Sequence, residues 1–335
     1  MTLYCGIDLH SNNHVVVVID DQDRRLVEKR LPNNLNATLA LLEPMRDQLI
    51  GIVVESTFNW YWLVDGLMAA GFDVKLANTA AIRQYEGLKH TEDRYDAFFL
   101  AHLLRLGILP TGYIYPPQQR AVRDLMRRRM QLVRTAATQL ISIQSQLWRS
   151  TGQRIASSRL RHPKYALPLP PGHTLLAASA QQTIYHTIHY EIDALEQAAL
   201  RAVRLHPKFE VLKTIRGVGP VLALTIMLET GDIRRFPTVG DFSSYCRCVK
   251  AERLSNGKRK GEGNRKAGNK YLSWAFSEAA HFAVQYEPAA KRFFERKRAK
   301  TNGIVAIRAT AHKLARASYY LLRDQVPFNA QRLFS

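Results

Sequence analysis

Residues 4–21 read YCGIDLHSNNHVVVVIDD, and this stretch decides the fold of the N-terminal part of the chain. Turn formers separate its apolar run, Tyr4–Asp8, from its β-branched run, Val15–Ile19, which is the pattern of two strands joined by a turn. A weaker alternation over Arg25–Leu31 indicates a third strand. We therefore expect the chain to begin with an antiparallel meander of three strands.

Helical and strand patterns alternate after this meander. They predict a helix over Leu35–Leu49, a strand over Ile50–Glu55, a helix over Phe58–Ala70, a strand over Phe72–Leu76 and a helix over Asp93–Leu106. The resulting order is βββαβαβα, with the first three strands antiparallel. This is the ribonuclease H-like (RuvC-like) arrangement, so the fold class expected here is α/β.

The middle of the chain has the pattern of a long helical hairpin. Beyond Pro116-Pro117, apolar or small residues recur at alternating spacings of four and three, which predicts a long helix with coiled-coil character. The series is Val122, Met126, Val133, Ala136, Leu140, Ile143 and Leu147, interrupted by Arg129. Prolines end it, and a second helix follows over about Leu175–Arg204. The seam fits packing within one subunit as well as it fits a dimer.

A third, mostly helical unit follows, and it ends in a helix with one apolar face over Ile304–Arg323. The expected domains are thus a RuvC-like domain at 1–112, a helical coiled-coil segment at 113–205 and a C-terminal domain at 206–335.

The charge of the chain indicates a polyanionic partner. Its 335 residues include 48 Lys+Arg against 28 Asp+Glu, which gives a formal net charge of +20. Such an excess repels itself unless a polyanion neutralises it, and nucleic acid is the usual one. A membrane surface fits less well, because the basic residues are not confined to one amphipathic helix.

The sequence also predicts where the protein acts. No run approaches the roughly 18 apolar residues of a membrane span, and the N-terminus lacks the pattern of a signal peptide. Cys5, Cys246 and Cys248 are too few for a disulfide framework, and no second Cys/His pair stands at zinc-ligand spacing. We expect a cytoplasmic, nucleoid-associated protein with reduced cysteines.

Four acids are expected to converge on one metal site. Asp8 and Glu55 end the first and fourth strands, which are neighbours in a ribonuclease H-like sheet. Asp93 and Asp96 are three residues apart and share one helix face. Clustered carboxylates become stable mainly by holding divalent cations, and Mg²⁺ prefers oxygen ligands. Such a site supports in-line displacement at phosphorus, so these four are the candidate catalytic and metal-binding residues.

Other polar residues near these acids have simpler interpretations. Asp20, Asp21 and Asp23 are expected to be hairpin-turn residues. One of His10, His14 and His90 could be a general base, but a structural or surface role is favoured for each.

Two features of the third unit predict contacts with phosphates. Ile215–Pro220 followed by Val221–Leu228 has the form of a helix-hairpin-helix, in which Arg216, Gly217 and Gly219 would approach a phosphate. Residues 247–270 then carry nine basic residues, two acids and four glycines, which favours a loop lying on a phosphate backbone. Its candidate nucleic-acid-binding residues are Lys258, Arg259, Lys260, Arg265, Lys266 and Lys270.

A serine nucleophile is a further possibility in this basic loop. Ser255 stands at its start, where neighbouring cations and a nearby metal could stabilise an alkoxide. Ser243 and Ser244 compete with it for this role.

Ordered motifs along almost the whole chain match a known family. Gly6-Ile7-Asp8, Val53–Thr57 and Lys89–Ala97 are followed by Ile215–Pro220, Gly231–Phe236, Phe242–Tyr245, Ser255–Lys258 and Gly268–Leu272. In these motifs and in their order, the chain resembles the DEDD insertion-sequence transposases, which join a RuvC-like domain to a serine-bearing C-terminal transposase domain.

The resemblance implies an RNA-guided DNA recombinase. A structured RNA encoded at the end of the element would pair with donor and target DNA, and the protein would act as a tetramer, a dimer of dimers. By position, Asp8, Glu55, Asp93 and Asp96 would bind Mg²⁺, and Ser255 would attack the phosphodiester from another subunit. A covalent protein–DNA linkage would form, and strands would exchange through a Holliday-type junction.

Three alternatives remain at this point. A junction-resolving nuclease would use the same acids with metal-activated water. A sugar-kinase or actin-type ATPase also begins with Gly-Ile-Asp before a hairpin, but its second phosphate-binding hairpin and its adenosine-binding glycine pair are not found. A non-catalytic RNA-binding protein explains the charge but leaves four convergent carboxylates without a purpose.

Overall fold

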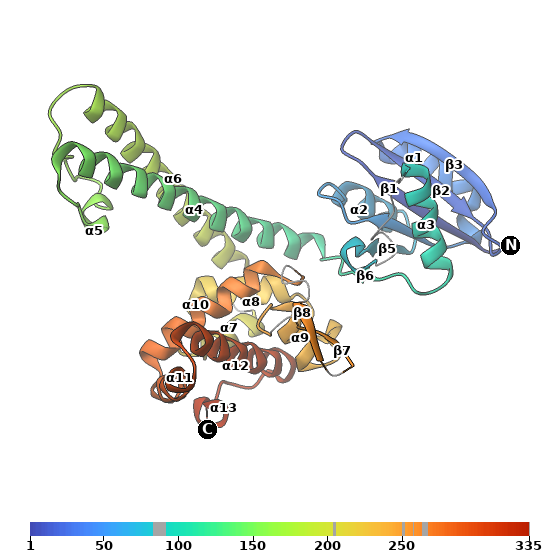
Figure 1. Cartoon of the computed structure of the whole chain (residues 1–335). Helices are drawn as coiled ribbons and strands as arrows, with labels where there is room; N and C mark the ends of the chain where they lie inside the picture. Colours follow the sequence, from blue (N-terminus) through green and yellow to red (C-terminus); the bar gives the residue numbers. More distant parts are fainter. Residues whose placement is uncertain (83–91, 204–205, 250–251, 257, 263–266, 335) are drawn as a thin grey trace. The chain divides into compact units, whose positions relative to one another are not determined.

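The computed structural model describes residues 1–82, 92–203, 206–249, 252–256, 258–262 and 267–334 (Figure 1). Its contacts divide the chain into two compact units, Met1–Pro117 and Gln118–Ser335. None of the described helices is both long enough and apolar enough to cross a membrane.

The first unit is built on a mixed sheet. Its strands are β1 (Leu3–Leu9), β2 (Asn13–Ile19), β3 (Arg25–Pro32), β4 (Leu49–Glu55), β5 (Val74–Ala77) and β6 (Thr111–Gly112). They lie in the order β3-β2-β1-β4-β5-β6. The predicted meander is present, since β1 pairs with β2 and β2 with β3 in antiparallel fashion. β4 lies parallel to β1 and β5 parallel to β4, whereas β6 closes antiparallel to β5.

The two faces of β1 bury different partners because successive side chains point to opposite sides. Leu3, Cys5, Ile7 and Leu9 belong to the core formed with α1 (Leu35–Leu42) and α2 (Tyr61–Ala69). On the opposite face, α3 (Asp93–Arg105) packs through Ala97 and Ala101 against alternate residues of β2. A Cβ on Gly6 would overlap the carbonyl oxygen of Ala97. Glycine at position 6 therefore lets α3 lie directly on β1.

Two predicted helices of this unit need correction, and two short elements were not predicted. The single helix predicted over Leu35–Leu49 is wrong, because α1 ends at Leu42 and a 3₁₀ helix, Glu43–Gln48, follows with Pro44 in its first turn. Proline has no N–H to continue an α-helical ladder. The second helix begins at Tyr61 rather than Phe58. β6 and a 3₁₀ turn at Thr79–Ala81 were not predicted, since both are too short to show periodicity.

The second unit begins with a helical hairpin. It consists of α4 (Pro117–Thr151), the short α5 (Ser157–Leu160) and α6 (His173–Val203). The seam predicted on α4 packs within this chain, where Leu140, Ile143 and Leu147 share a core with residues of α6 such as Tyr185. Arg129, which interrupts the apolar series, pairs with Glu196 of α6 at 2.6 Å. The interruption is thus an ion pair across the hairpin.

Short helices around one apolar core complete the chain. They are α7 (Pro207–Lys213), α8 (Pro220–Thr230), the 3₁₀ helix Ile233–Arg235, α9 (Val239–Tyr245), α10 (Lys270–Tyr286), α11 (Pro288–Lys300), α12 (Gly303–Asp324) and α13 (Ala330–Phe334). The fully buried Phe242 and Phe276 lie in this core. The apolar-faced helix predicted over Ile304–Arg323 is α12. A two-stranded sheet of β7 (Glu252–Ser255) and β8 (Lys258–Glu262) lies between α9 and α10 in sequence.

Candidate active site

Two of the predicted acids stand side by side on neighbouring parallel strands. Ile7 of β1 is in register with Val54 of β4, so the residues that follow, Asp8 and Glu55, end up adjacent. Asp8 is 3% exposed, and it shares a hydrogen bond with Glu55.

Helix α3 adds the other two acids. Asp93 is its first residue, and Asp96 lies one turn further along the same face. The charge of Asp96 acts on Glu55, and the charges of Asp8 and Asp93 act on Asp96. The structure therefore brings together all four carboxylates that the sequence singles out.

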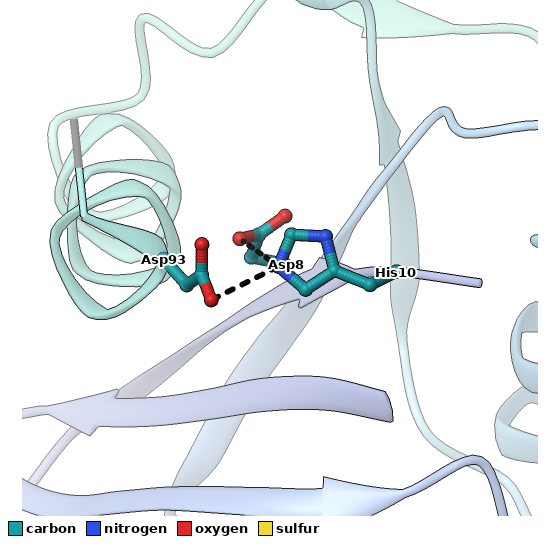
Figure 2. Close-up of side chains that lie close together, drawn as sticks. All are labelled: Asp8, His10 and Asp93. Carbon is teal, nitrogen blue, oxygen red and sulfur yellow. Dashed lines mark ion pairs between the residues drawn. The ribbon is translucent and has the colours of Figure 1, made fainter. Parts of the chain in front are cut away.

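Two cationic or titratable side chains frame this acidic site. Dashed lines in Figure 2 join His10 to both Asp8 and Asp93: its Nε2 lies 3.2 Å from Asp8 Oδ2 and 3.3 Å from Asp93 Oδ2. These are ion-pair distances, although His10 Nε2 makes no hydrogen bond of good geometry with the described residues. Arg30 of β3 donates from Nη2 to Asp93 Oδ2 at 2.6 Å. His10 and Arg30 thus hold Asp93 at the rim of the site.

The surroundings of the acids shift their pKa values in different directions. Burial, the hydrogen bond with Asp8 and the charges of Asp8 and Asp96 raise the pKa of Glu55 to about 8. Burial and the charges of Asp8 and Asp93 likewise raise the pKa of Asp96. The Arg30 hydrogen bond lowers the pKa of Asp93. Burial and neighbouring acids therefore dominate at Glu55 and Asp96, whereas Arg30 offsets the charge of Asp93.

The residues present fit a divalent cation. One ligand atom each from Asp8, His10 and Asp93 lie within 4.8 Å of one another. Asp96 Oδ1 is buried and has no hydrogen-bond partner in the part of the chain described here. A buried oxygen without a donor is unfavourable, and a cation would satisfy it. A bound cation would also stabilise the deprotonated forms of Glu55 and Asp96.

The other polar residues singled out from the sequence of this unit have structural roles. His14 is fully buried, and its ring nitrogens contact Thr38 Oγ1 at 2.9 Å and Asn33 Oδ1 at 3.1 Å. Asp20 accepts from two backbone amides of its own turn. Asp23 binds His102 and Arg105 of α3. His90 lies outside the described residues.

The predicted helix-hairpin-helix corresponds to α7, a turn and α8. Gly217 in the turn has φ +99°, and a Cβ there would lie 2.6 Å from the backbone nitrogen of Ala283 in α10. Close packing against α10 therefore explains why residue 217 is a glycine. The Cβ position of Gly219 faces open space, and the side chain of Arg216 is 67% exposed, 3.7 Å from Glu287.

The described residues of the basic segment form a β-hairpin where a loop was predicted. Ser255 pairs with Lys258 across the β7–β8 hairpin, and Asn256 has φ +51°. Asn-Gly is a strong signal for such a two-residue hairpin, so the sequence Asn256-Gly257 could have revealed it. Lys258, Lys260 and Lys270 are exposed. Arg265, Lys266 and the side chain of Arg259 lie outside the described part.

The candidate serines have different surroundings in the structure. Ser243 is 1% exposed, and its hydroxyl donates to the Val239 carbonyl at 2.8 Å within α9. Ser244 is exposed on the same helix. The backbone of Ser255 ends β7 beside the hairpin turn, whereas its side chain lies outside the described part.

Sequence reasoning missed the residues that assemble the acidic site. Gly6 was noted only as part of a motif, yet it sets the distance between α3 and β1. Arg30 was not considered, because 63 residues separate it from Asp93. A lone arginine in an otherwise exposed strand carries no local signal of such a contact.

Comparison with known proteins finds matches to transposases in both parts of the chain. A DEDD transposase model of the IS110 type matches residues 5–150, and the model "Transposase IS116/IS110/IS902 family" matches residues 209–295. The Streptomyces coelicolor "Mini-circle putative transposase for IS117" is 26% identical over 414 aligned positions, which cover 100% of this chain and 97% of that protein.

Two further relatives match over shorter stretches. An "Insertion element IS110 uncharacterized 43.6 kDa protein" of Streptomyces coelicolor is 27% identical over 139 residues, and the match spans 41% of this chain and 34% of that protein. A Pseudomonas aeruginosa "Probable family 20 transposase" is 24% identical over 237 residues, or 67% of this chain and 68% of that protein. The matched regions include the strands and helix that carry the acids and the helices that flank the basic hairpin, and they show that the chain belongs to the IS110 family of transposases, enzymes that act on DNA in transposition.

Proposed function

We propose that this enzyme is an RNA-guided, site-specific transposase-recombinase of an insertion sequence, which cleaves and exchanges DNA strands with Mg²⁺ and a serine nucleophile. The observation that carries the proposal is the convergence of Asp8, Glu55, Asp93 and Asp96 at one edge of the sheet. The strand order and the position of α3 also support a ribonuclease H-like domain.

The four carboxylates would hold Mg²⁺. When bound, the ion supplies positive charge to the phosphate oxygens in an in-line displacement. The chain's own residues prepare for it: Gly6 lets α3 approach β1, and Arg30 fixes Asp93. Glu55 would release its proton when the ion arrives, since its raised pKa has the neighbouring acids as a cause.

Ser255 would be the nucleophile. Its hydroxyl oxygen would lose its proton and form a bond to phosphorus as the phosphodiester bond to a DNA oxygen breaks. The leaving DNA oxygen would take up a proton, so that one proton is lost and one is gained. Return attack by a DNA hydroxyl would release the serine and join the exchanged strand. The proposal is supported by the place of Ser255 on the basic hairpin and by the hydrogen-bonded burial of Ser243.

The basic residues would bind the nucleic acids. Arg216, Gly217 and Gly219 in the α7–α8 turn, and Lys258, Arg259, Lys260, Arg265, Lys266 and Lys270 in the basic segment, would contact phosphates of DNA and of a structured guide RNA. We propose three functional domains, at 1–112, 113–205 and 206–335, in a tetrameric dimer of dimers that acts at the nucleoid in the cytoplasm. The net charge of +20 supports polyanionic partners.

The nucleophile is tested by replacing Ser255 with alanine. Ser255→Ala should abolish covalent protein–DNA adducts while DNA binding stays unchanged, and the matched control Ser244→Ala should retain them. Adducts are measured by denaturing electrophoresis with and without protease. Adducts at the wild-type level in Ser255→Ala would show that another group attacks.

Metal and RNA dependence are tested separately. Asp8→Asn should stop both cleavage and exchange, whereas the exposed Asp47→Asn should not. Strand exchange should also require RNA transcribed from the DNA that flanks the gene and should disappear after RNase treatment. Exchange that is unchanged by RNase would leave the recombinase activity standing but would exclude RNA guidance.

A junction-cleaving nuclease is the second candidate. The acid cluster by itself is sufficient for attack by metal-activated water, without any serine. This activity would leave free DNA ends whose mobility does not change on protease treatment, so the same electrophoresis distinguishes the two functions.

A further inference from the structure

A buried carboxylate lies in the second unit, apart from the acidic site. Glu229 is 2% exposed, near the end of α8, in which every residue from Leu222 to Thr230 is buried. Arg127 of α4 donates to both of its oxygens, from Nε at 2.6 Å and from Nη2 at 2.8 Å. A two-pronged pair of this kind fixes direction as well as distance. It ties the long helix α4 to the core of the C-terminal helices.

The same carboxylate binds Asn269, just before α10. Asn269 Nδ2 donates to Glu229 Oε2 at 2.7 Å, while Oδ1 accepts from the backbone amides of Tyr271 and Leu272 at 2.8 and 3.1 Å. Its own amide donates to the carbonyl of Tyr245 at 2.6 Å. An amide side chain is needed here, because one end must donate and the other must accept.

Asn269 and its neighbours close the base of the basic segment. Arg247 donates from Nη2 to the carbonyl of Gly268 at 2.8 Å and from Nε to the carbonyl of Ala267 at 3.1 Å. Gly268 has φ +88°, and a Cβ there would lie 2.5 Å from the carbonyl oxygen of Tyr245. We call Arg247, Gly268 and Asn269, which join the two ends of this segment, the neck. In the sequence, the β7–β8 hairpin lies between Arg247 and Gly268 of the neck.

The contacts of Glu229 fix a geometry in addition to any stability that they provide. A buried ion pair is seldom more stabilising than apolar residues of the same size, whereas it does fix one geometry. Here hydrogen bonds connect Arg127 to Glu229 and Glu229 to Asn269, which belongs to the neck. We call these three linked residues the series. A shift of α4 at Arg127 would therefore reach the neck.

We propose that Arg127, Glu229 and Asn269 are positioning residues that hold the neck against α4 and so set the direction of the β7–β8 hairpin and of Ser255. The inference rests on the proposed role of Ser255 as nucleophile. It assigns no chemical step to these three residues, which act only through the hairpin.

Two variants break the series without removing side-chain volume. Glu229→Gln loses the ion pair, and Asn269→Asp keeps the cap of α10 but turns the donor toward Glu229 into an oxygen. At saturating DNA, each should lower the single-turnover rate of adduct formation about 10–100-fold, because a misplacement of about 1 Å has effects of that size. DNA affinity should stay within about two-fold of wild type, since the exposed basic residues remain.

The matched control is Glu196→Gln. Glu196 also pairs with an arginine of α4, Arg129 at 2.6 Å, but it belongs to α6 and has no contact with the neck. Its adduct rate should match that of wild type. Hydrogen exchange of the amides in residues 252–262 should be faster in Glu229→Gln and Asn269→Asp and unchanged in Glu196→Gln.

The outcomes separate the inference from the proposed function. Wild-type adduct rates and unchanged exchange in a folded Glu229→Gln or Asn269→Asp variant would overturn the positioning role. If Glu229→Gln does not fold, Asn269→Asp decides alone. If even the wild type forms no Ser255-dependent adduct, the proposed nucleophile fails, and hydrogen exchange still determines whether the series holds the hairpin.

Discussion

Glu229 is buried and Glu55 is partly buried, and the neighbours of these two carboxylates differ in charge. Glu229 meets the guanidinium of Arg127 and the amide of Asn269. Glu55 meets Asp8 and Asp96 instead, and its pKa is raised to about 8 by burial and by these acids. Where the chain supplies the cation itself, the carboxylate serves the architecture. Where it gathers acids, a proton or the divalent cation proposed above would offset the negative charge.

The same contrast divides the acidic site internally. Asp93 has Arg30 as a fixed partner, and that hydrogen bond lowers its pKa. Asp96 has no such donor among the described residues, and its pKa is raised. The inner acids are therefore those whose state should change most when a cation binds.

The largest expected effect comes from removing the internal cation. Arg127→Met takes the guanidinium away from the buried carboxylate of Glu229, which should lower the free energy of unfolding by about 3–5 kcal/mol. The matched variant Arg30→Met removes an arginine from half-exposed Asp93 and should cost no more than about 1 kcal/mol. Urea unfolding followed by circular dichroism measures both.

A double variant sharpens this comparison. Glu229→Leu combined with Arg127→Met should recover most of the lost stability, because the charge that lost its guanidinium partner is gone. If Arg127→Met destabilises no more than Arg30→Met does, Glu229 is not held by the pair, and the contrast with Glu55 fails.

A smaller effect is expected when the approach of α3 to the sheet is disturbed. Gly6→Ala places a methyl group where the carbonyl of Ala97 lies, and overpacking of this kind costs about 1–3 kcal/mol. Because α3 carries Asp93 and Asp96, the variant should also lose the rise in melting temperature that a divalent cation gives the wild type. Gly303→Ala is the control, since its Cβ position faces open space, and it should stay within about 0.5 kcal/mol.

The sequence predicted residues that act through their place on an element, and it missed those that act through a distant contact. Asp8 and Glu55 could be assigned because strand ends are visible as the ends of apolar runs. Glu229 had a local signal that was not used: it is an acid in the otherwise apolar or hydroxyl-bearing stretch Leu222–Thr230. Its partner Arg127 lies 102 residues away, and no periodicity connects the two.

Short elements were the other source of error. Pro44 marks the end of α1 in the sequence, but the apolar spacing beyond it suggested that the helix continued. In the basic segment, the high charge suggested a loop, although Asn256-Gly257 is a hairpin signal. In both places a local backbone preference prevailed over the pattern of side chains.

The pH dependence of stability is the most direct measure of the difference between the two carboxylates. An acid whose pKa is raised in the folded protein binds its proton more tightly there than in the unfolded chain, so its contribution to stability is full at low pH and is lost as pH rises. For Glu55 this loss falls between its ordinary pKa of 4.5 and the folded value of about 8. The free energy of unfolding without metal should therefore decline across this range.

Bound Mg²⁺ should reverse that trend, because the ion competes with the proton for the same oxygens. The Mg²⁺-induced rise in melting temperature should thus grow from pH 6 to pH 8.5, and titration calorimetry should detect a proton released on binding near pH 7. Glu55→Gln should remove the pH dependence of the metal effect, whereas Glu229→Gln should leave it unchanged because Glu229 already has its cation. If Mg²⁺ stabilises the Glu55→Gln and wild-type proteins equally at every pH, the acids gathered around Glu55 are not there for a metal ion.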